Sequence, residues 1–374
     1  MANFNTQNWL SSLGIGSLRQ SLFPTYLGVD IGTTSIKVVE VKQGKQLPQV
    51  VNYGFSEESR YLGRPSNAIQ TSALKIFDQE ASEILMAIIR KMKPSTKEVI
   101  ASLPSFSAFM TVLSFPEMTA SELGKSITYQ AKQYIPLPLS EVAMEWVKVG
   151  EYVDEQGFKV QQVLLISVPQ ENIKKYQQIF KTAGLNLHWL ELESMSVGRV
   201  LIGGDPTPTI VIDIGSRSTN IAFFEKGQLR FNAQSDFGGA AVTQALTTSL
   251  NINPRRAEEL KRERGIIGGG AEHELSTIMT PFLDAIINDV KKAQFNYNNQ
   301  FVEALRPERV IMSGGGSNLL GADRYFEREL GVTTVKATPF VRFEYPTVIE
   351  PLVPQLNTLL SVALGLGMRE FVSQ

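Results

Sequence analysis

The chain contains no cysteine, and this absence excludes disulfide bonds, thiolate metal sites and a cysteine nucleophile. It also fits a reducing compartment. Histidine is nearly absent: His188 and His273 are far apart and lack the spacing of zinc ligands. We therefore expect structural roles for both histidines and assign no metal to them.

No excess of either charge is present, since 36 Lys and Arg residues balance 37 Asp and Glu residues and the net charge is -1. This balance gives no electrostatic reason for a nucleic-acid partner, although a nucleotide pocket needs suitable groups only locally. Runs of about 18 apolar residues are also missing, so we expect a chain that does not span a membrane by itself.

At 374 residues, of which 43% are hydrophobic, the chain is too long for the usual single core and should divide into domains. Its first segment, Met1 to Thr25, has a weak apolar stripe broken by Gly14 and Gly16. We expect a flexible N-terminal arm there, one that docks on a partner or on the protein's own body.

One sequence design occurs twice. Tyr26 to Lys45 (YLGVDIGTTSIKVVEVKQGK) and Thr209 to Gln228 (TIVIDIGSRSTNIAFFEKGQ) each contain an apolar strand, an Asp-Ile-Gly corner, a hydroxyl-rich turn and a returning strand. The repeat predicts two lobes built on one α/β plan.

Each corner has the residue types of an anion-binding loop. Gly32 and Gly215 allow backbone N–H groups to come close to an anion, and hydroxyl groups follow both glycines. These hydroxyl residues are Thr33, Thr34 and Ser35 in the first corner, and Ser216, Ser218 and Thr219 in the second. A hairpin with locally satisfied side chains explains one corner alone, whereas the pair favours a polyphosphate held from both sides.

Charged residues of the corners point to a cation as well. Asp30 and Asp213 stand at strand ends, where they would bind a hydrated Mg²⁺ through its water molecules. Lys37, seven residues after Asp30, is placed to reach a phosphate oxygen.

A third element, Arg309 to Gly321 (RVIMSGGGSNLLG), predicts a strand, a glycine turn and a helix start. The glycines leave room for a ribose or a flat ring, and a helix N-terminus favours an anion. The residues that we assign to this nucleotide-binding loop are Gly314, Gly315, Gly316 and Asn318.

Two helices of the second lobe add candidate contacts. Phe237-Gly238-Gly239 starts a helix from Ala240 to Leu250, and Asn253 caps a second helix that ends at Gly265. Glu258 and Lys261 lie on one face of the second helix. They suit a ribose contact or a surface ion pair worth tenths of a kcal/mol, and charge alone does not choose between these.

The segment from Pro104 to Pro169 predicts an inserted subdomain, with a capped helix from Ala120 to Tyr134 and a hairpin from Glu141 to Val168. We therefore expect an arm at 1–25, lobe 1 at 26–206 with the insertion at 104–170, and lobe 2 at 207–374 with a helical part at about 240–305. Four apolar residues of the insertion form either a surface for a partner peptide or the subdomain's own core: Ala131, Tyr134, Ile135 and Leu137.

Two phosphate-type corners followed by a strand-GGGS-helix loop resemble the actin-like ATPase superfamily, which includes actin, sugar kinases, heat-shock chaperones and FtsA. The resemblance covers nearly the whole chain after Tyr26. It implies an actin-like, ribonuclease H-like fold of two duplicated lobes with an FtsA-type inserted subdomain. Glu258 and Lys261 match a helix that contacts ribose in the FtsA branch.

Two further stretches resemble the PilM family of type IV pilus assembly: Ser114 to Val142 (SFPEMTASELGKSITYQAKQYIPLPLSEV) and Glu171 to Val200 (ENIKKYQQIFKTAGLNLHWLELESMSVGRV). One departure is Gln130, where that family usually has an acidic residue.

The resemblance implies that ATP and Mg²⁺ bind between the lobes and that the N-terminal tail of a PilN-like inner-membrane protein docks beside the inserted subdomain. The complex would link the membrane platform to the pilus motor ATPases of twitching motility. The protein would then be cytoplasmic and peripheral to the inner membrane through its partner, with self-association left open.

Three functions fit the pattern. The first is an ATP-dependent binding module that is at most a slow ATPase, with no catalytic residue assigned. A sugar or metabolite kinase would need a base aligned with a substrate hydroxyl, and Glu191 and Glu193 suit either a water-orienting or a structural role. An FtsA-like filament protein is expected to carry a C-terminal membrane helix, and none follows Met368.

Overall fold

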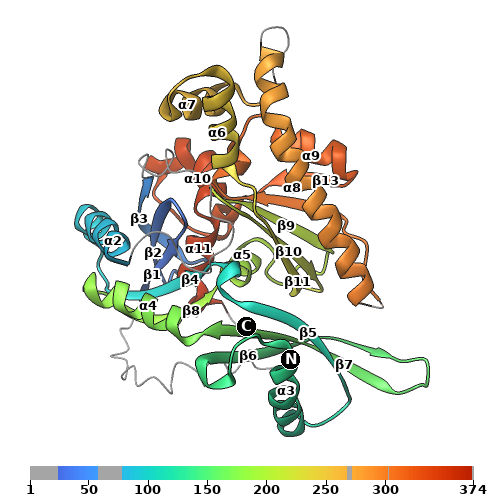
Figure 1. Ribbon diagram of the computed structural model, residues 1–374. Helices are drawn as coiled ribbons and strands as arrows, with labels where there is room; N and C mark the ends of the chain where they lie inside the picture. Colours follow the sequence, from blue (N-terminus) through green and yellow to red (C-terminus); the bar gives the residue numbers. More distant parts are fainter. Residues whose placement is uncertain (1–23, 58–77, 268–271, 302, 373–374) are drawn as a thin grey trace.

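The computed structural model describes residues 24–57, 78–267, 272–301 and 303–372. The first of its sheets has five strands in the order β3-β2-β1-β4-β8 (Figure 1). Strands β1 to β3 form an antiparallel meander, whereas β4 and β8 run parallel to β1. The strand bounds are β1 Thr25–Ile31, β2 Ser35–Lys42, β3 Gln49–Glu57, β4 Glu98–Leu103 and β8 Asn186–Leu192.

A second five-stranded sheet repeats this topology in the order β11-β10-β9-β12-β13. Its first three strands are again antiparallel, and the last two are again parallel to the first. The bounds are β9 Thr209–Ile214, β10 Thr219–Glu225, β11 Gln228–Ser235, β12 Arg309–Ser313 and β13 Thr333–Lys336. The repeated sequence design therefore folds into two sheets with one strand order.

Helices cover both faces of the first sheet, so its central strands β1 and β4 are buried over nearly their whole length. Helices α2 (Asp78–Met92) and α4 (Gln170–Thr182) contact each other and the sheet on one side, whereas α5 (Glu193–Leu201) and α11 (Ser361–Gly367) contact it on the other. Helix α5 also contacts β10 and β11 and thus lies between the two sheets, near the centre of Figure 1.

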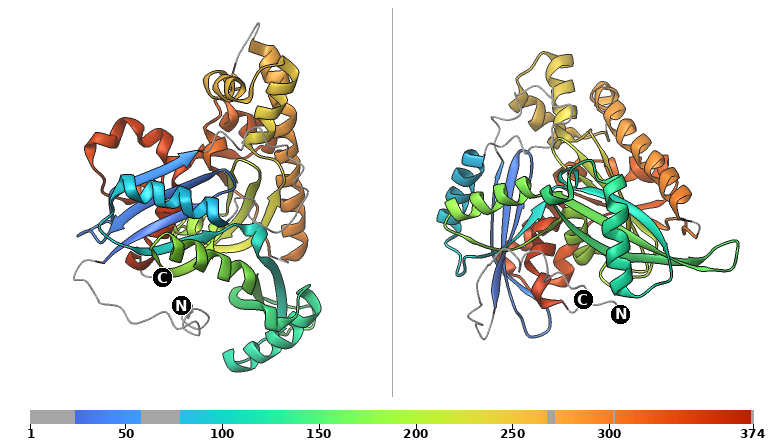
Figure 2. Two further views of the ribbon diagram at one scale, coloured as in Figure 1. Left: turned by 60° about the vertical axis from the view of Figure 1, so that its left-hand side comes forward. Right: turned by 60° about the horizontal axis from the view of Figure 1, so that its bottom comes forward.

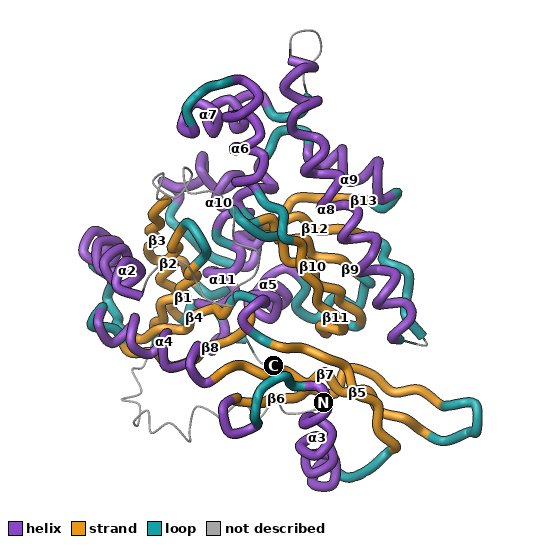
Figure 3. Tube along the Cα trace, viewed as in Figure 1, coloured by secondary structure: helices purple, strands orange, loops and turns teal. Residues whose placement is uncertain are grey.

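The remaining helices belong mainly to the second sheet. They are α6 (Gly239–Leu250), α7 (Pro254–Arg264), α8 (Glu272–Gln300), α9 (Ala322–Leu330) and α10 (Val353–Leu359). Helices α6 and α7 pack together at the end of this lobe opposite the inserted subdomain, as Figure 3 shows. Asn253 caps α7, since its side chain accepts a hydrogen bond from the backbone N–H of Arg256 at 2.9 Å.

The inserted segment forms its own three-stranded antiparallel sheet in the order β5-β7-β6, with helix α3 (Ala120–Tyr134) packed on it. The strands are β5 Phe109–Pro116, β6 Val142–Val153 and β7 Lys159–Pro169. The predicted capping box of α3 is present, because Thr119 and Glu122 satisfy each other's backbone N–H groups. Figure 2 shows this subdomain projecting from the two large sheets.

Two features differ from the sequence expectation. No long helix follows the triple glycine directly, because Gly314 and Gly321 adopt left-handed φ angles of 82° and 87° around a short 3₁₀ turn, Gly315–Asn318. Helix α9 begins only after Gly321. The expected N-terminal arm lies outside the described residues except for its last two.

The C-terminal helix packs on the first sheet, as Gly365 and Gly367 indicate, because glycine inside a helix is costly unless it allows close packing. Helix α11 contacts β1, β2 and β4, and glycines make this approach possible. A Cβ atom added to Gly28 of β1 would lie 2.0 Å from the carbonyl oxygen of Ala363 and 2.6 Å from the nitrogen of Gly367. A Cβ at Gly365 would lie 2.1 Å from the carbonyl oxygen of Ser196 in α5.

Within the described ranges no single helix has the length and apolar character of a membrane span. The one pair that meets these criteria together, Thr347–Leu359 with Ser361–Gly367, is bent by 94°, and length and composition are the only evidence for it.

We expect Gly28→Ala to lower the free energy of unfolding by about 1–3 kcal/mol, because the backbone of α11 must move to admit the methyl group. Urea denaturation measures this loss. Gly124→Ala is the matched control, since Gly124 lies inside α3 with no atom within 4 Å of the added Cβ, and it should gain up to about 1 kcal/mol. Equal stability of the two variants would contradict the close contact of β1 with α11.

Candidate functional site

The two Asp-Ile-Gly corners have the same local geometry. In each, the backbone N–H of the corner glycine donates to a carbonyl oxygen three residues later: Gly32 to Ser35 at 2.9 Å and Gly215 to Ser218 at 3.0 Å. A Cβ at these glycines would lie 3.2 Å and 2.9 Å from the same carbonyl oxygens. The tight turn therefore requires a small residue in both lobes.

Each corner aspartate accepts a hydrogen bond from a buried serine on the neighbouring parallel strand. Ser102 Oγ donates to Asp30 Oδ1 at 3.0 Å, and Ser313 Oγ donates to Asp213 Oδ2 at 3.3 Å. Sequence reasoning did not single out either serine, although both lie near the end of the fourth strand of their sheet. The internal repeat thus extends beyond the two corner stretches.

Carboxylates from both lobes influence the pKa of the Lys37 amine. Lys37 stands opposite Asp30 in the β1–β2 ladder, and its Nζ lies 2.8 Å from Asp30 Oδ2. Burial lowers the pKa of Lys37, but the charges of Asp30, Asp213 and Glu193 outweigh burial and raise it. Lys37 is therefore paired with Asp30 and is close enough to Asp213 of the second corner to be affected by its charge.

Negative charge is in excess around Lys37. Burial, reinforced by Asp30, raises the pKa of Asp213 to about 6, although Lys37 and the hydrogen bond from Ser313 oppose the rise. Burial together with the carboxylates of Asp30 and Asp213 raises the pKa of Glu193 well above its usual range. Three carboxyl groups with one ammonium make a site that a cation would stabilise.

The structure separates the two glutamates near the lobe connection. Glu191 is buried between two arginines, with Arg199 nitrogens at 2.6 Å and 2.8 Å and Arg369 also in contact. Burial raises the pKa of Glu191, but the two guanidinium groups outweigh it and hold the pKa below its usual value. Glu191 is structural, whereas Glu193, the first residue of α5, lies beside the corner aspartates.

The triple-glycine turn packs directly on the second corner. A Cβ at Gly314 would lie 2.4 Å from the carbonyl oxygen of Ile214 and 2.5 Å from Asp213 Oδ1, and one at Gly316 would lie 2.4 Å from Ile214 Cγ2. Gly315 has more room, with its nearest atom 3.6 Å away. Asn318 ends the turn and donates to the carbonyl oxygen of Gln355 at 3.3 Å.

The start of α6 lies on the other side of the same corner. The N–H of Gly239 donates to the carbonyl oxygen of Gly215 at 3.0 Å, and the N–H of Ala240 donates to that of Ser216 at 2.7 Å. The N–H of Gly239, one of the candidate contact residues, is therefore satisfied inside the protein.

Glu258 and Lys261 form an ion pair of 2.6 Å with side chains only 17% and 13% exposed. Lys261 Nζ also donates to the carbonyl oxygen of Gly239 at 3.1 Å, and Thr243 Oγ1 donates to Glu258 at 2.6 Å. The ion pair that the sequence suggested is present, but it is largely shielded from solvent and not on the open surface. The two residues join α7 to the start of α6, next to the second corner.

The hydroxyl residues divide into two groups. Thr33, Thr34, Ser35, Ser216 and Ser218 are half-buried on the two turns. Thr219 is fully buried, and its Oγ1 donates to the carbonyl oxygen of Phe237 at 2.8 Å. We therefore remove Thr219 from the groups that can face a ligand.

The predicted peptide surface also divides. Ala131 and Ile135 are 0% and 7% exposed and belong to the core of the inserted subdomain, as one of the two sequence interpretations held. Tyr134 and Leu137 are 47% and 39% exposed. Only these two remain candidates for contact with a partner.

Among the described residues, no group of three or more His, Cys, Asp or Glu residues is arranged to hold a metal ion by itself. Two carboxylates from two strands suit Mg²⁺ only if water or ligand oxygens complete its shell.

The duplicated sheets define an actin-like fold, and solved structures agree. The chain is similar to the structure of a PilM–PilN type IV pilus biogenesis complex, with a TM-score of 0.75 and 20% identity. The match covers 93% of this chain and 99% of the chain in that structure. The chain is also similar to MreB5 of Spiroplasma citri bound to AMPPNP, with a TM-score of 0.55 and 13% identity over 94% and 97% of the two chains. The predicted fold class is confirmed.

Sequence comparison is more specific. The chain is 22% identical to the cell division protein FtsA of Enterococcus hirae over 357 residues, which cover 84% of this chain and 78% of that protein. The family model described as type IV pilus assembly protein PilM matches residues 28–371. The chain belongs to the PilM family, as the quoted stretches predicted.

The raised pKa of Asp213 predicts a pH-dependent stability. Since the folded-state pKa of about 6 lies above the ordinary 3.8, the folded protein binds more protons, and stability falls as pH rises between these values. Asp213→Asn should therefore be more stable than the wild type at pH 8, by at most about 3 kcal/mol, and equally stable near pH 4. Urea titrations across this range measure the difference, and a constant difference would contradict the prediction.

Proposed function

We propose that the junction between the two lobes binds ATP with Mg²⁺. The observation that carries this proposal is the meeting of Asp30 and Asp213, one from each lobe, around Lys37. Glycine at both corners leaves backbone within reach of an anion, and the excess of carboxylate favours a cation. A Mg²⁺–polyphosphate ligand has both charges that this arrangement requires.

Each group has a defined task in such a site. Asp30 and Asp213 would hold water molecules of the cation, and the five half-buried hydroxyl groups on the turns would donate to phosphate oxygens. Gly315, which has the most room of the three glycines, would lie next to the nucleoside, whereas Gly314 and Gly316 let the turn pack on the second corner. When bound, the nucleotide would contact charged and polar groups of both lobes. Binding would then stabilise the folded protein by about 2.7 kcal/mol at a hundredfold excess of nucleotide over Kd.

Glu193 limits what chemistry the site performs. Burial and the charges of Asp30 and Asp213 raise the pKa of Glu193, so it is a poor general base while those charges are not balanced. Among the described residues that we considered for this role, no other carboxylate lies beside the corner aspartates, since Glu191 is paired with two arginines. We therefore propose a slow ATPase at most, whose nucleotide is mainly structural or regulatory.

We further propose that the inserted subdomain binds the N-terminal cytoplasmic tail of a PilN-like inner-membrane protein and thereby links the pilus platform to its motors. Two findings support this proposal: membership of the PilM family and the similarity to the structure of a PilM–PilN complex. Tyr134 and Leu137, adjoining the end of α3, are the exposed apolar groups that we assign to the contact. The protein would then reach the inner membrane through this partner.

Neutralising a corner carboxylate should weaken nucleotide binding. We expect Asp30→Asn and Asp213→Asn each to raise the Kd for Mg-ATP at least tenfold, or about 1.4 kcal/mol, in isothermal titration calorimetry. Glu155→Gln, an exposed change in the β6–β7 turn, should leave Kd unchanged. Wild-type affinity in both corner variants would refute the site.

Truncation of the exposed apolar groups should weaken the partner complex. We expect Tyr134→Ala and Leu137→Ala each to lower the affinity for a synthetic PilN-like tail peptide by more than about 1 kcal/mol, measured by fluorescence anisotropy. Phe158→Ala is the control, because Phe158 is 64% exposed at the far turn of the same subdomain. If the peptide binds all three variants equally, the contact lies elsewhere. Polymer formation without peptide binding would favour the FtsA-like alternative.

A further inference from the structure

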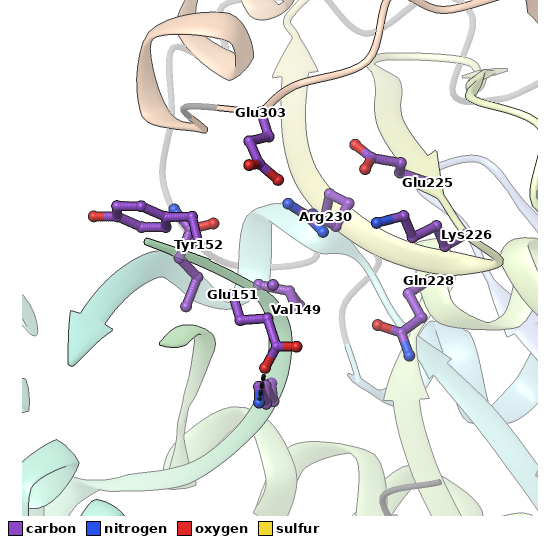
Figure 4. Close-up of a pocket in the computed structure, with 11 residues that line it drawn as sticks. Val149, Glu151, Tyr152, Glu225, Lys226, Gln228, Arg230 and Glu303 are labelled. Atoms are coloured by element: carbon purple, nitrogen blue, oxygen red, sulfur yellow. Dashed lines mark hydrogen bonds and ion pairs between the residues drawn. The ribbon is translucent and has the colours of Figure 1, made fainter. Parts of the chain in front are cut away.

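A pocket of about 290 Å³ lies where the inserted subdomain meets the second lobe. Strands β6 and β7 contribute one wall, the β10–β11 hairpin contributes the other, and Glu303 lies beyond the end of α8. None of the corner residues lines this pocket. Figure 4 shows Tyr152 and Glu151 on the subdomain side, Lys226 and Gln228 on the lobe side, and Arg230 between them.

Arg230 is a buried, positively charged residue that lines this pocket. The residue is only 8% exposed, and its Nε–H lacks a hydrogen-bond partner among the described residues. Nor does Arg230 take part in an ion pair within that part of the chain. A buried guanidinium group without an anion is costly, so this charge is a candidate for a ligand.

Packing, rather than an anion, holds the guanidinium group in place. Its central carbon lies 4.6 Å from the centre of the Phe301 ring, a cation–π contact. On the opposite wall, Gly150 of β6 leaves the space that the group needs, since a Cβ there would lie 2.9 Å from a terminal nitrogen of Arg230. The N–H donors of Arg230 are thus held in position before a ligand binds, at the interface between the inserted subdomain and the second lobe.

The carboxylates that line the pocket do not pair with Arg230. Glu151 pairs with Lys148 at 2.7 Å, and Glu225 accepts a hydrogen bond from the hydroxyl of Tyr297 at 2.6 Å. Glu303 also lines the pocket, and it forms no hydrogen bond or ion pair with Arg230 in the part of the chain that the structure describes. Lys226, exposed on the hairpin, adds a second positive charge at the mouth.

We propose that this pocket binds a carboxylate group on Arg230. A planar carboxylate matches the two parallel donors of a guanidinium group. A dianionic phosphate fits less well, because Glu151, Glu225 and Glu303 also line the pocket and would repel the second charge. The volume is that of a small ligand or one side chain, so the carboxylate comes from a free small acid or from an acidic residue of a peptide.

Such a ligand would touch both walls at once and would hold the inserted subdomain against the second lobe. This site does not depend on the nucleotide proposal, because it shares no residue with the corners.

The Nε–H resonance of Arg230 in ¹⁵N-labelled full-length protein reports binding directly. We expect N-acetyl-glutamate amide to shift this resonance with saturation, whereas the neutral N-acetyl-glutamine amide should not. Glutarate serves as the free acid: binding of both carboxylates supports the site with a peptide source, and binding of glutarate alone supports it with a free-acid source. A shift with inorganic phosphate alone, or with none of the compounds, would overturn the assignment.

Variants separate binding from folding. Arg230→Gln should weaken glutamate-amide binding at least tenfold, measured by saturation-transfer NMR on the ligand. Lys226→Gln, on the exposed rim, keeps Arg230 in place and should weaken binding by a smaller factor. Arg328→Gln is the matched control, because Arg328 also lies over an aromatic ring, at 4.8 Å from that of Tyr325, but lines no part of this pocket. If Lys226→Gln and Arg230→Gln both bind like the wild type, the proposal is wrong.

Discussion

The carboxylate groups of Asp30 and Asp213, one from each lobe, lie near each other at the lobe junction, although like charges repel. The strand order and the neighbouring polar groups hold them there. Each corner sits at the end of the first strand of a sheet, and the same strand order in both lobes presents both corners in the same way. Lys37 and the two buried serines, Ser102 and Ser313, stabilise the negative charges without cancelling them. The remaining negative charge is the basis of our proposal that the junction binds a ligand.

Close backbone contacts connect this junction to the C-terminal segment. Gly28, two residues before Asp30, lies against α11, and the N–H of Gly314 donates to the carbonyl oxygen of Thr358 at 3.0 Å. The residues from Thr358 to Gly367 therefore contact β1 of one lobe and the glycine turn of the other. A ligand that moves one lobe relative to the other would strain both contacts, so nucleotide binding and C-terminal packing should be coupled.

Local signals predicted most of the fold. Turn glycines, the capping box at Thr119 and the cap at Asn253 fixed elements whose ends agree with the structure, because they act over a few residues. The corner aspartates were also found, because the motif occurs twice. The docking of α11 on the first sheet was indicated by its two helical glycines and not by periodicity, since a helix that buries its whole surface shows little periodicity.

The misassigned site residues have a common physical cause. Thr219 and Gly239 have the right chemistry for their predicted roles, but tertiary contacts already satisfy the Thr219 hydroxyl and the Gly239 N–H. Ala131 was left open between a partner surface and the subdomain's own core, and it lies in the core. The roles of Ser102 and Ser313 and the position of Glu193 beside the corner aspartates depend on which strands are neighbours, and the sequence does not show this directly. Arg230 had no sequence signal, because its significance depends on a pocket formed by segments far apart in the chain.

The central claim is that Asp30 and Asp213 serve one ligand. A double-mutant cycle on the Kd for Mg-ATP, with Asp30→Asn, Asp213→Asn and both together, tests it most directly. If both aspartates hold the hydration shell of one cation, the combined loss should differ from the sum of the single losses by at least about 1 kcal/mol. Strictly additive losses would show that the two carboxylates act on separate ligands, and the account of a shared site would fail.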